Sequence, residues 1–234
     1  MTTSPEAARR HDPRPWDTDW LMLRGLTRTF EEMFRRSVAR RAQVLDFGCG
    51  AMPYRAFVEQ HGAEYVGADF EAGAMVRIDA DGRLPVADDS MDAVISVQVL
   101  EHVRDLDLYL NEAARVLKKD GVLLLSTHGT WLYHPHPEDH RRWTRTGLVH
   151  DVETRGFRVR EIDSIVGPLA TATLLRLTGY VFFLRQLPLV GHGLAKALAV
   201  VMNARGWLED KLTPAGIRAD NGCIFIVNCV KSGA

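Results

Sequence analysis

Residues 44–50 read V-L-D-F-G-C-G, and this run constrains the fold more than any other part of the chain. Its first two residues end an apolar stretch that is typical of a buried strand, and Asp46 follows directly. Gly48 and Gly50 carry no Cβ, so the turn that they form lets the backbone come close to a ligand. A strand that ends in an acid, followed by a glycine turn and a helix, predicts a nucleotide-binding α/β fold.

Three details favour S-adenosylmethionine over a dinucleotide as the ligand of this turn. A dinucleotide fingerprint needs glycine at position 53, where this chain has Pro53. Asp46 places a negative charge where a pyrophosphate would bind, and this charge suits an ammonium or a sulfonium group. Asp69 ends a second strand about twenty residues further on, where an acid can bind both hydroxyls of a ribose. The alternative is that Gly48 and Gly50 only close a tight turn.

Composition indicates a single globular domain with an insertion. The chain has 234 residues, of which 46% are hydrophobic and 25% are charged, as expected for a protein with a full core. A formal net charge of −1 gives no general attraction to nucleic acid, so we expect no nucleic-acid partner. The 3 cysteines lack C-x-x-C spacing and the polar N-terminus is no signal peptide, which predicts reduced thiols and a cytoplasmic location.

Strand and helix patterns alternate along the chain, which predicts a parallel sheet covered by helices on both faces. The predicted strands are Gln43–Phe47, Glu64–Ala68, Met75–Asp79, Ala93–Val97, Val122–Ser126, Arg158–Ile162 and Cys223–Val230. The predicted helices are one or two within 16–41, then Tyr54–Gln60, Leu106–Lys118 and Thr146–Arg155. We therefore divide the chain into a loose arm (1–15) and one domain (16–234), which comprises N-terminal helices (16–41), a cofactor-binding core (42–163), a helical insertion (164–212) and a final strand (213–234).

The insertion is the most apolar part of the chain. It contains two blocks, Leu169–Leu184 and Leu187–Met202, which charged residues and prolines interrupt. A membrane-spanning helix needs about 20 nearly uninterrupted apolar residues, so we expect none here. Three roles stay open: a lid over the substrate, a dimer face in a homodimer, or a surface that rests on lipid in peripheral contact with a membrane.

Several further motifs occur in a fixed order after the glycine turn. They are Gly67-Ala68-Asp69, then residues 84–94 (L-P-V-A-D-D-S-M-D-A-V), 99–103 (V-L-E-H-V), 115–118 (R-V-L-K) and 142–144 (R-W-T). With these motifs the chain resembles the class I S-adenosylmethionine-dependent methyltransferases of the ubiquinone-biosynthesis-like, type 11 group. The resemblance implies a doubly wound, mostly parallel seven-stranded sheet of Rossmann-like type, whose last strand is antiparallel and inserted between its neighbours. Met52 departs from the family, which usually has a third glycine there.

The resemblance also implies a role for individual residues in binding S-adenosylmethionine and its product, S-adenosylhomocysteine. The implied cofactor-binding residues are Asp46, Gly48, Cys49, Gly50, Asp69, Phe70, Asp79, Ala80, Gln98 and His102. The glycine turn would hold the methionine part, Asp69 the ribose and Phe70 the adenine, while Gln98 would line the sulfonium side. Core packing is the alternative role of Phe70.

Histidines follow the fifth predicted strand, at the edge where open α/β sheets bind ligands. His128 ends this strand, and the next loop reads H-P-H-P-E-D-H-R-R-W over residues 134–143. Removing a proton from an oxygen acceptor needs a base near neutral pH, so His128, His136 and His140 are the candidate catalytic bases, and Arg141 is the candidate catalytic residue that would hold an anionic group of the substrate. A metal site of His134, His136 and Asp139 or His140 is a weaker hypothesis, because the ligand spacing is irregular, and we expect no metal. The alternative is a proline-stiffened substrate loop.

The predicted function is therefore methyl transfer to a small or lipid-linked acceptor, with O-methylation in the biosynthesis of a secondary metabolite, glycan or lipid as the specific expectation. Two alternatives remain, because a fold does not fix a function. One is an enzyme that uses S-adenosylmethionine for a reaction other than methylation, such as a cyclase or an isomerase. The other is a non-catalytic protein that retains the cofactor pocket.

Overall fold

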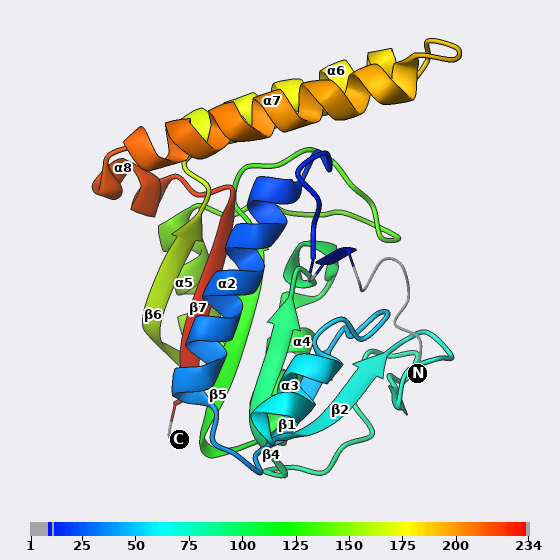
Figure 1. Cartoon of the computed structure of the whole chain (residues 1–234). Coiled ribbons are helices and arrows are strands. Elements are labelled where there is room, and N and C mark those ends of the chain that lie inside the picture. The colour runs from blue at the N-terminus through cyan, green and yellow to red at the C-terminus, as the bar shows by residue number, and fades with distance from the viewer. Residues whose placement is uncertain (1–8, 11, 233–234) are drawn as a thin grey trace.

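A sheet of 7 strands forms the centre of the protein (Figure 1), and the computed structural model describes residues 9–10 and 12–232. The strands are β1 (Gln43–Phe47), β2 (Glu64–Asp69), β3 (Val76–Arg77), β4 (Met91–Val97), β5 (Leu117–His128), β6 (Phe157–Ile165) and β7 (Ile224–Lys231). The helices are α2 (Trp20–Ser37), α3 (Arg55–His61), the 3-10 turn η1 (Leu100–His102), α4 (Leu106–Val116), α5 (Arg145–Glu153), α6 (Pro168–Leu184), α7 (Gly191–Leu212) and α8 (Ala215–Asp220). The predicted arm, 1–15, lies mostly outside the described residues.

The strands lie in the order β3-β2-β1-β4-β5-β7-β6. Strands β1 to β5 run parallel, and β7 runs antiparallel between β5 and β6. This topology confirms the mostly parallel sheet that the family resemblance implies. The all-parallel sheet predicted from alternation alone is wrong at β7, because a long connection such as 166–223 leaves the direction of the next strand undetermined.

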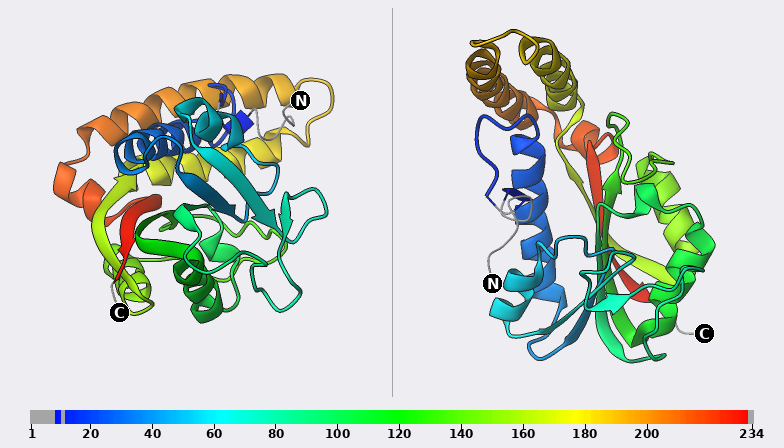
Figure 2. Two further views of the ribbon diagram at one scale, coloured as in Figure 1. Left: turned by 90° about the horizontal axis from the view of Figure 1, so that it is seen from below. Right: turned by 90° about the vertical axis from the view of Figure 1, so that its right-hand side faces the viewer.

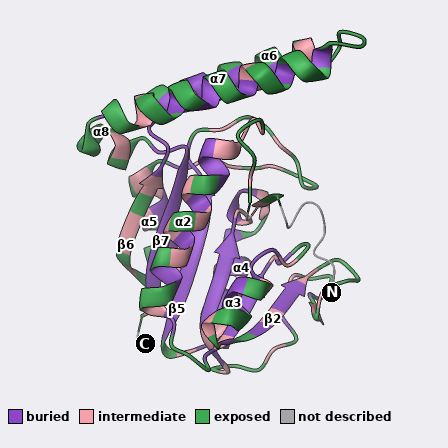
Figure 3. Cartoon of the chain, in the orientation of Figure 1, coloured by how far each residue is buried: buried purple, intermediate pink, exposed green. Residues whose placement is uncertain are grey.

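Helices cover both faces of the sheet (Figure 2). Side chains alternate between the faces along each strand, so Val44 packs beneath α2 and α3 while Leu45 packs beneath α4 and α5. The central strands are almost wholly buried (Figure 3), as expected for parallel strands covered on both sides. The polar residues at the strand ends are therefore the ones free to form a site.

A single helix, α2, accounts for the apolar periodicity before the first strand. Phe30, Met33 and Phe34 lie on one face of this helix and are fully buried. The rings of Phe30 and Phe34 pack on α3, where the ring centroids of Phe34 and Phe57 are 5.3 Å apart. This apolar face fixes α2 and α3 over β1, so the turn after β1 sits on a rigid support.

Helices α6 and α7 form an antiparallel hairpin across the end of the molecule to which the parallel strands point, and its connecting loop projects past the core (Figure 1). The first predicted apolar block matches α6, but α7 begins later than the second block because residues 185–190 form the loop. Two contacts hold the base of the hairpin: Gly167 N donates to Asp210 Oδ1 (2.6 Å), and Asn203 Nδ2 donates to the carbonyl oxygen of Asp17 (2.8 Å). Within the described ranges, no helix has the length and apolar character needed to cross a membrane.

The elements differ from the sequence predictions at several places. The third strand spans only Val76–Arg77, because Asp79 N donates to Arg83 O and turns the chain away from β2. Helix α4 ends at Val116 instead of Lys118, and β5 starts at the next residue. Helix α8 was not predicted, since its six residues contribute no buried side chain and so no apolar pattern.

Candidate active site

The turn between β1 and α3 depends on two glycines for different reasons. Gly48 has φ +85°, and a Cβ there would lie 2.6 Å from Val99 Cγ1. Gly50 has φ +46°, but a Cβ there would meet no atom within 4 Å. Close packing therefore demands glycine at position 48, whereas Gly50 faces open space where a ligand can approach its backbone. Met52 adopts φ +53°, so the methionine occupies the left-handed conformation that a glycine at this position would favour.

The Asp46 carboxyl lies inside this turn, not on its surface. Its side chain is 2% exposed, and Tyr65 Oη donates a 2.6 Å hydrogen bond to Oδ2. Burial raises the pKa of Asp46 to about 7, because the surroundings disfavour its charged form. A cation bound beside Asp46 would restore the ionised form, so this carboxyl is suited to an ammonium or sulfonium ligand.

Asp69 joins the end of β2 to the glycine turn. Its Oδ2 accepts a hydrogen bond from Gly50 N (2.9 Å), and its Oδ1 accepts one from Glu71 N (3.2 Å). A carboxylate has about four lone-pair sites, so it can still accept two hydroxyl donors. Phe70 is 57% exposed, which excludes core packing and leaves its ring free to stack on a base.

The other residues implied for the cofactor lie along the same edge of the sheet. Asp79 and Ala80 are exposed just after β3. Gln98 follows β4 with φ +59°, and its Nε2 donates to Ser126 Oγ (3.2 Å). Cys49 is buried in the glycine turn, where its amide donates to Ala68 O (3.1 Å), and burial raises the pKa of its thiol to about 12. The Cys49 thiol is therefore not a nucleophile.

The candidate catalytic residues fall into different surroundings. His128 is 3% exposed, and burial lowers its pKa to about 2, so the ring is neutral and a poor base. Arg141 donates to the carbonyl oxygens of Val103 and Arg104. Its guanidinium is therefore engaged in hydrogen bonds within the protein. His140 Nε2 lies 3.1 Å from Glu138 Oε2. His136 is exposed on the loop, which leaves it the freest of the four to meet an acceptor.

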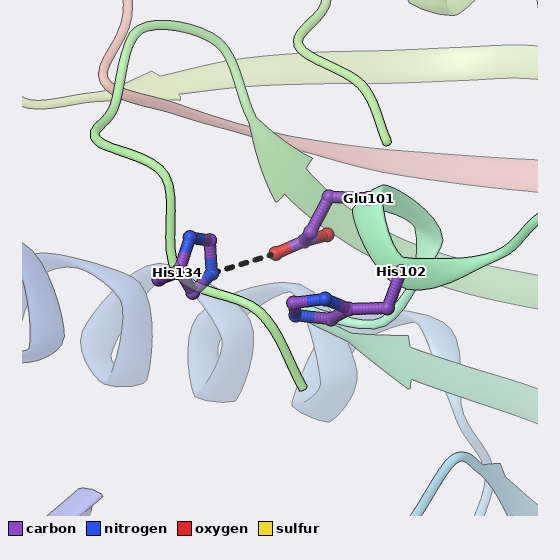
Figure 4. A group of neighbouring side chains, drawn as sticks. All are labelled: Glu101, His102 and His134. Carbon is purple, nitrogen blue, oxygen red and sulfur yellow. Dashed lines mark ion pairs between the residues drawn. The ribbon is translucent and has the colours of Figure 1, made fainter. Parts of the chain in front are cut away.

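Glu101 was missed as a site residue by the sequence prediction, although it lies at the centre of the histidines. It is fully buried on η1, and burial raises its pKa to about 7. His134 Nε2 lies 3.9 Å from Glu101 Oε1 (Figure 4). His128 Nε2 lies 3.6 Å from the same oxygen. The signal was present in the sequence, because Glu101 and His102 are two adjacent polar residues in the short segment that follows an apolar strand. The sequence prediction assigned a role only to His102.

Comparison with known proteins finds a family match over part of the chain. Residues 45–125 match the family described as a methyltransferase domain. A protein of Mycolicibacterium smegmatis named as a probable S-adenosylmethionine-dependent methyltransferase is 28% identical over 153 residues, which cover 57% of this chain and 60% of that protein. The ubiquinone biosynthesis O-methyltransferase of Chelativorans sp. is 29% identical over 100 residues, or 36% of this chain and 40% of that protein. The matched region thus spans about half the length of these relatives.

Solved structures show the same fold at low sequence identity. The cyclase SpnF matches with a TM-score of 0.57 at 16% identity, covering 92% of this chain and 83% of its own. Phosphoethanolamine N-methyltransferase 2 of Haemonchus contortus, in complex with S-adenosylmethionine, matches with a TM-score of 0.55 at 15% identity, covering 100% of this chain and 61% of its own. Residues 45–125 are thus similar to a methyltransferase domain, and the sheet order agrees with that of the class I S-adenosylmethionine-dependent methyltransferases, whose cofactor is S-adenosylmethionine.

Proposed function

We propose that this protein transfers the methyl group of S-adenosylmethionine to an oxygen atom of a small, lipid-like acceptor and releases S-adenosylhomocysteine. The observation that carries the proposal is the pair of acids at the ends of neighbouring strands. Asp46 is buried beside the glycine turn, and Asp69 is bonded to Gly50 N in the same turn. This arrangement supports the proposal that the two carboxyls bind the cationic and the ribose ends of one nucleoside.

Cofactor binding is tested by calorimetry with S-adenosylhomocysteine. Asp69→Ala removes the ribose partner and leaves Gly50 N unpaired, so we expect affinity to fall by about 1–3 kcal/mol, or roughly 5- to 150-fold. Asp163→Ala, at an exposed position on β6, is the matched control and should bind as the parent protein does. Equal affinity of Asp69→Ala and the parent protein would contradict the assignment.

Methyl transfer is tested by incubation with labelled S-adenosylmethionine and candidate acceptors. An enzyme that uses the cofactor for another reaction would bind it and release no S-adenosylhomocysteine, and a non-catalytic scaffold would bind it and convert nothing. His136 is our candidate base for an oxygen acceptor, because imidazole is suited to proton transfer near neutral pH and this ring is accessible on the loop after β5. His136→Ala should therefore lower kcat by about 10²–10⁴-fold while leaving cofactor affinity unchanged.

The lipid-like character of the acceptor is inferred from the tip of the α6–α7 hairpin. The exposed apolar side chains at this tip are Phe182, Phe183, Leu187, Leu189 and Val190, and we call them the apolar tip. Between 164 and 208 the chain carries four cationic residues (Arg176, Arg185, Lys196 and Arg205) and no acidic residue. Exposed apolar side chains beside cations suit the surface of an anionic bilayer. We propose that the apolar tip rests on such a surface and brings the sheet edge to a lipid-like acceptor.

Sedimentation with vesicles tests this contact. We expect binding to phosphatidylglycerol vesicles, weaker binding to phosphatidylcholine, and loss of both in the triple variant Phe182→Ser, Phe183→Ser, Leu189→Ser. The control is Leu208→Ser with Leu212→Ser, two exposed leucines at the other end of α7. If the triple variant binds vesicles normally but changes from dimer to monomer, the tip is a dimer face. If it binds vesicles normally and only raises the KM of a soluble acceptor, the hairpin is a lid.

A further inference from the structure

The structure leaves a buried carboxylate oxygen without a partner at the edge of the proposed acceptor site. Glu101 is fully buried on η1, between the ends of β4 and β5. Its Oε2 accepts a 2.8 Å hydrogen bond from Thr127 Oγ1, but Oε1 has no hydrogen-bond partner. Buried polar atoms almost always have a partner, because an unpaired one is costly. An unpaired buried oxygen therefore points to a group that the protein alone does not supply.

Imidazole rings surround this oxygen. His134 Nε2 lies 3.9 Å from Glu101 Oε1, and one ligand atom from each of Glu101, His102 and His134 lies within 4.8 Å of the other two (Figure 4). The rings of His102 and His134 meet edge to face, with centroids 5.1 Å apart. These separations are too long for hydrogen bonds, so the polar atoms of the three side chains do not satisfy one another.

Hydrogen bonds on the outer side of both rings leave their inner nitrogens free. His102 Nδ1 lies 2.6 Å from Glu138 O, and His134 Nδ1 lies 3.1 Å from Leu132 O. An Nδ1–H that donates to a carbonyl leaves Nε2 as a lone-pair donor, which is the usual arrangement of a histidine that binds a metal. The neighbouring cation Arg142 is neutralised by Asp139, to whose two oxygens it donates at 2.5 Å and 2.7 Å.

One competing contact involves the same histidine. Arg142 Nη2 lies 3.3 Å from His134 Nδ1, but the two hydrogens of this Nη2 are already directed at Leu132 O (2.6 Å) and Asp139 Oδ2 (2.7 Å). Arg142 therefore has no hydrogen left for the ring. The Nδ1–H of His134 can share Leu132 O, since a carbonyl oxygen has two lone pairs.

We propose that Glu101, His102 and His134 bind one divalent transition-metal ion of the zinc type. One carboxylate and two imidazoles form a donor set that suits Zn²⁺, Co²⁺ or Fe²⁺ and disfavours Mg²⁺, which prefers oxygen ligands throughout. Bonds of about 2.1 Å in a tetrahedral site place ligand atoms about 3.4 Å apart, so ligand atoms that now lie within 4.8 Å of one another need to approach by at most about 1.4 Å. His102 and His134 are partly exposed, so their side chains have room to do so.

Three protein ligands leave at least one position open on such an ion. The cluster lies next to Gln98 on the edge of the sheet that binds the cofactor, so an oxygen of the acceptor is the group that we expect at the open position. This role rests on the proposed function, whereas binding of the ion does not. The site also differs from the loop site that the sequence suggested, because both oxygens of Asp139 are bound to Arg142.

The test uses the full-length protein, freed of metal with a chelator and titrated with Zn²⁺ by calorimetry and with Co²⁺ by visible absorption. We expect one ion per chain and a Co²⁺ spectrum typical of four or five ligands. Glu101→Gln keeps the acceptor for Thr127 but removes the charge, and it should weaken binding by about 100-fold or more, as should His102→Ala and His134→Ala. His136→Ala, in the same loop, is the matched control and should bind the ion normally.

Two results would overturn the inference. The first is failure of the metal-free parent protein to take up either ion. The second is a result that places the ion elsewhere. It would be an unchanged metal affinity in His134→Ala whose circular dichroism spectrum is like that of the parent, or a loss of metal affinity in His136→Ala equal to that in His134→Ala. Calorimetry with S-adenosylhomocysteine on the same samples separates this proposal from the proposed function, because a protein that binds the cofactor product but no metal loses only the metal site.

Discussion

The edge of the sheet that carries Asp46, Gly48 and Asp69, which we call the cofactor edge, differs from the α6–α7 hairpin in how strictly each position requires its residue. At the cofactor edge each residue has one specific task, as Gly48 shows by packing against Val99. In the hairpin, Gly179 and Gly193 have open space where a Cβ would be, and large apolar side chains are exposed. We infer that the proposed cofactor site needs exact backbone geometry, whereas the lipid contact proposed for the hairpin depends on composition and exposure.

Asp46→Asn should give the largest change in the free energy of unfolding. If it gave none, the cofactor edge would be as tolerant of substitution as the hairpin. The pKa of Asp46 is about 7 in the folded protein against an ordinary 3.8, so folding favours its protonated form. The cost of ionising it grows as pH rises from about 4 to about 7 and reaches about 4 kcal/mol above that range. Without the cofactor, the variant should therefore match the parent at pH 4 and exceed its free energy of unfolding by up to about 4 kcal/mol at pH 8.

Urea unfolding at both pH values measures this difference. Asp163→Asn on exposed β6 is the control and should show no such divergence between the two pH values. Should Asp46→Asn differ from the parent by the same amount at pH 4 and pH 8, the buried carboxyl would not be the cause.

Gly48→Ala should give the next largest effect. The new Cβ would lie 2.6 Å from Val99 Cγ1 at φ +85°, so both packing and backbone conformation oppose it. We expect the free energy of unfolding to fall by about 2–4 kcal/mol, as the sum of overpacking and a left-handed conformation. Gly50→Ala, which meets no neighbour, should cost only about 1 kcal/mol in stability and should weaken cofactor binding instead. Equal destabilisation by the two substitutions would contradict the different roles of these glycines.

Gly179→Ala in α6 should give the smallest effect, with the opposite sign. Gly179 is exposed in a helix, and a Cβ there would meet no atom within 4 Å, so alanine should stabilise the protein by about 0.5–1 kcal/mol. Gly191→Ala is the control, because its Cβ would lie 2.1 Å from Leu184 O and should destabilise the hairpin. Thermal unfolding measures both variants. A higher Tm for Gly179→Ala and a lower Tm for Gly191→Ala would show that the hairpin tolerates substitution within α6 but not at the turn between its helices.

The sequence predicts the fold well wherever neighbouring segments determine it. Strand β1 matches its predicted bounds, Gln43–Phe47, because apolar residues fill both faces of a central strand. Strand β3 is shorter than predicted, since the turn held by Asp79 and Arg83 is a contact that periodicity does not show. The direction of β7 came only from the family resemblance, because hydrophobic patterns are the same for parallel and antiparallel neighbours.

For the candidate site, the sequence predicted the position of some residues and missed that of others. Asp46 lies near the end of β1 and Asp69 is the last residue of β2, so their place at one edge could be derived from the sequence. Glu101 was missed because its importance comes from histidines on another segment and from burial, and neither is visible in a local pattern. Whether Arg141 holds a substrate could not be derived either, because its backbone partners, Val103 and Arg104, are distant in sequence.

The position of β7 inside the sheet has a consequence for how the chain is made. Strand β6 has β7 as its neighbour in the sheet order, yet residues 166–223 leave the ribosome between them. At about 5–20 residues per second, β6 waits roughly 3–12 s for that neighbour during translation. During that interval one edge of β5 and the apolar face of β6 are open to pairing with other nascent chains. Chaperone dependence should therefore concentrate in the second half of synthesis.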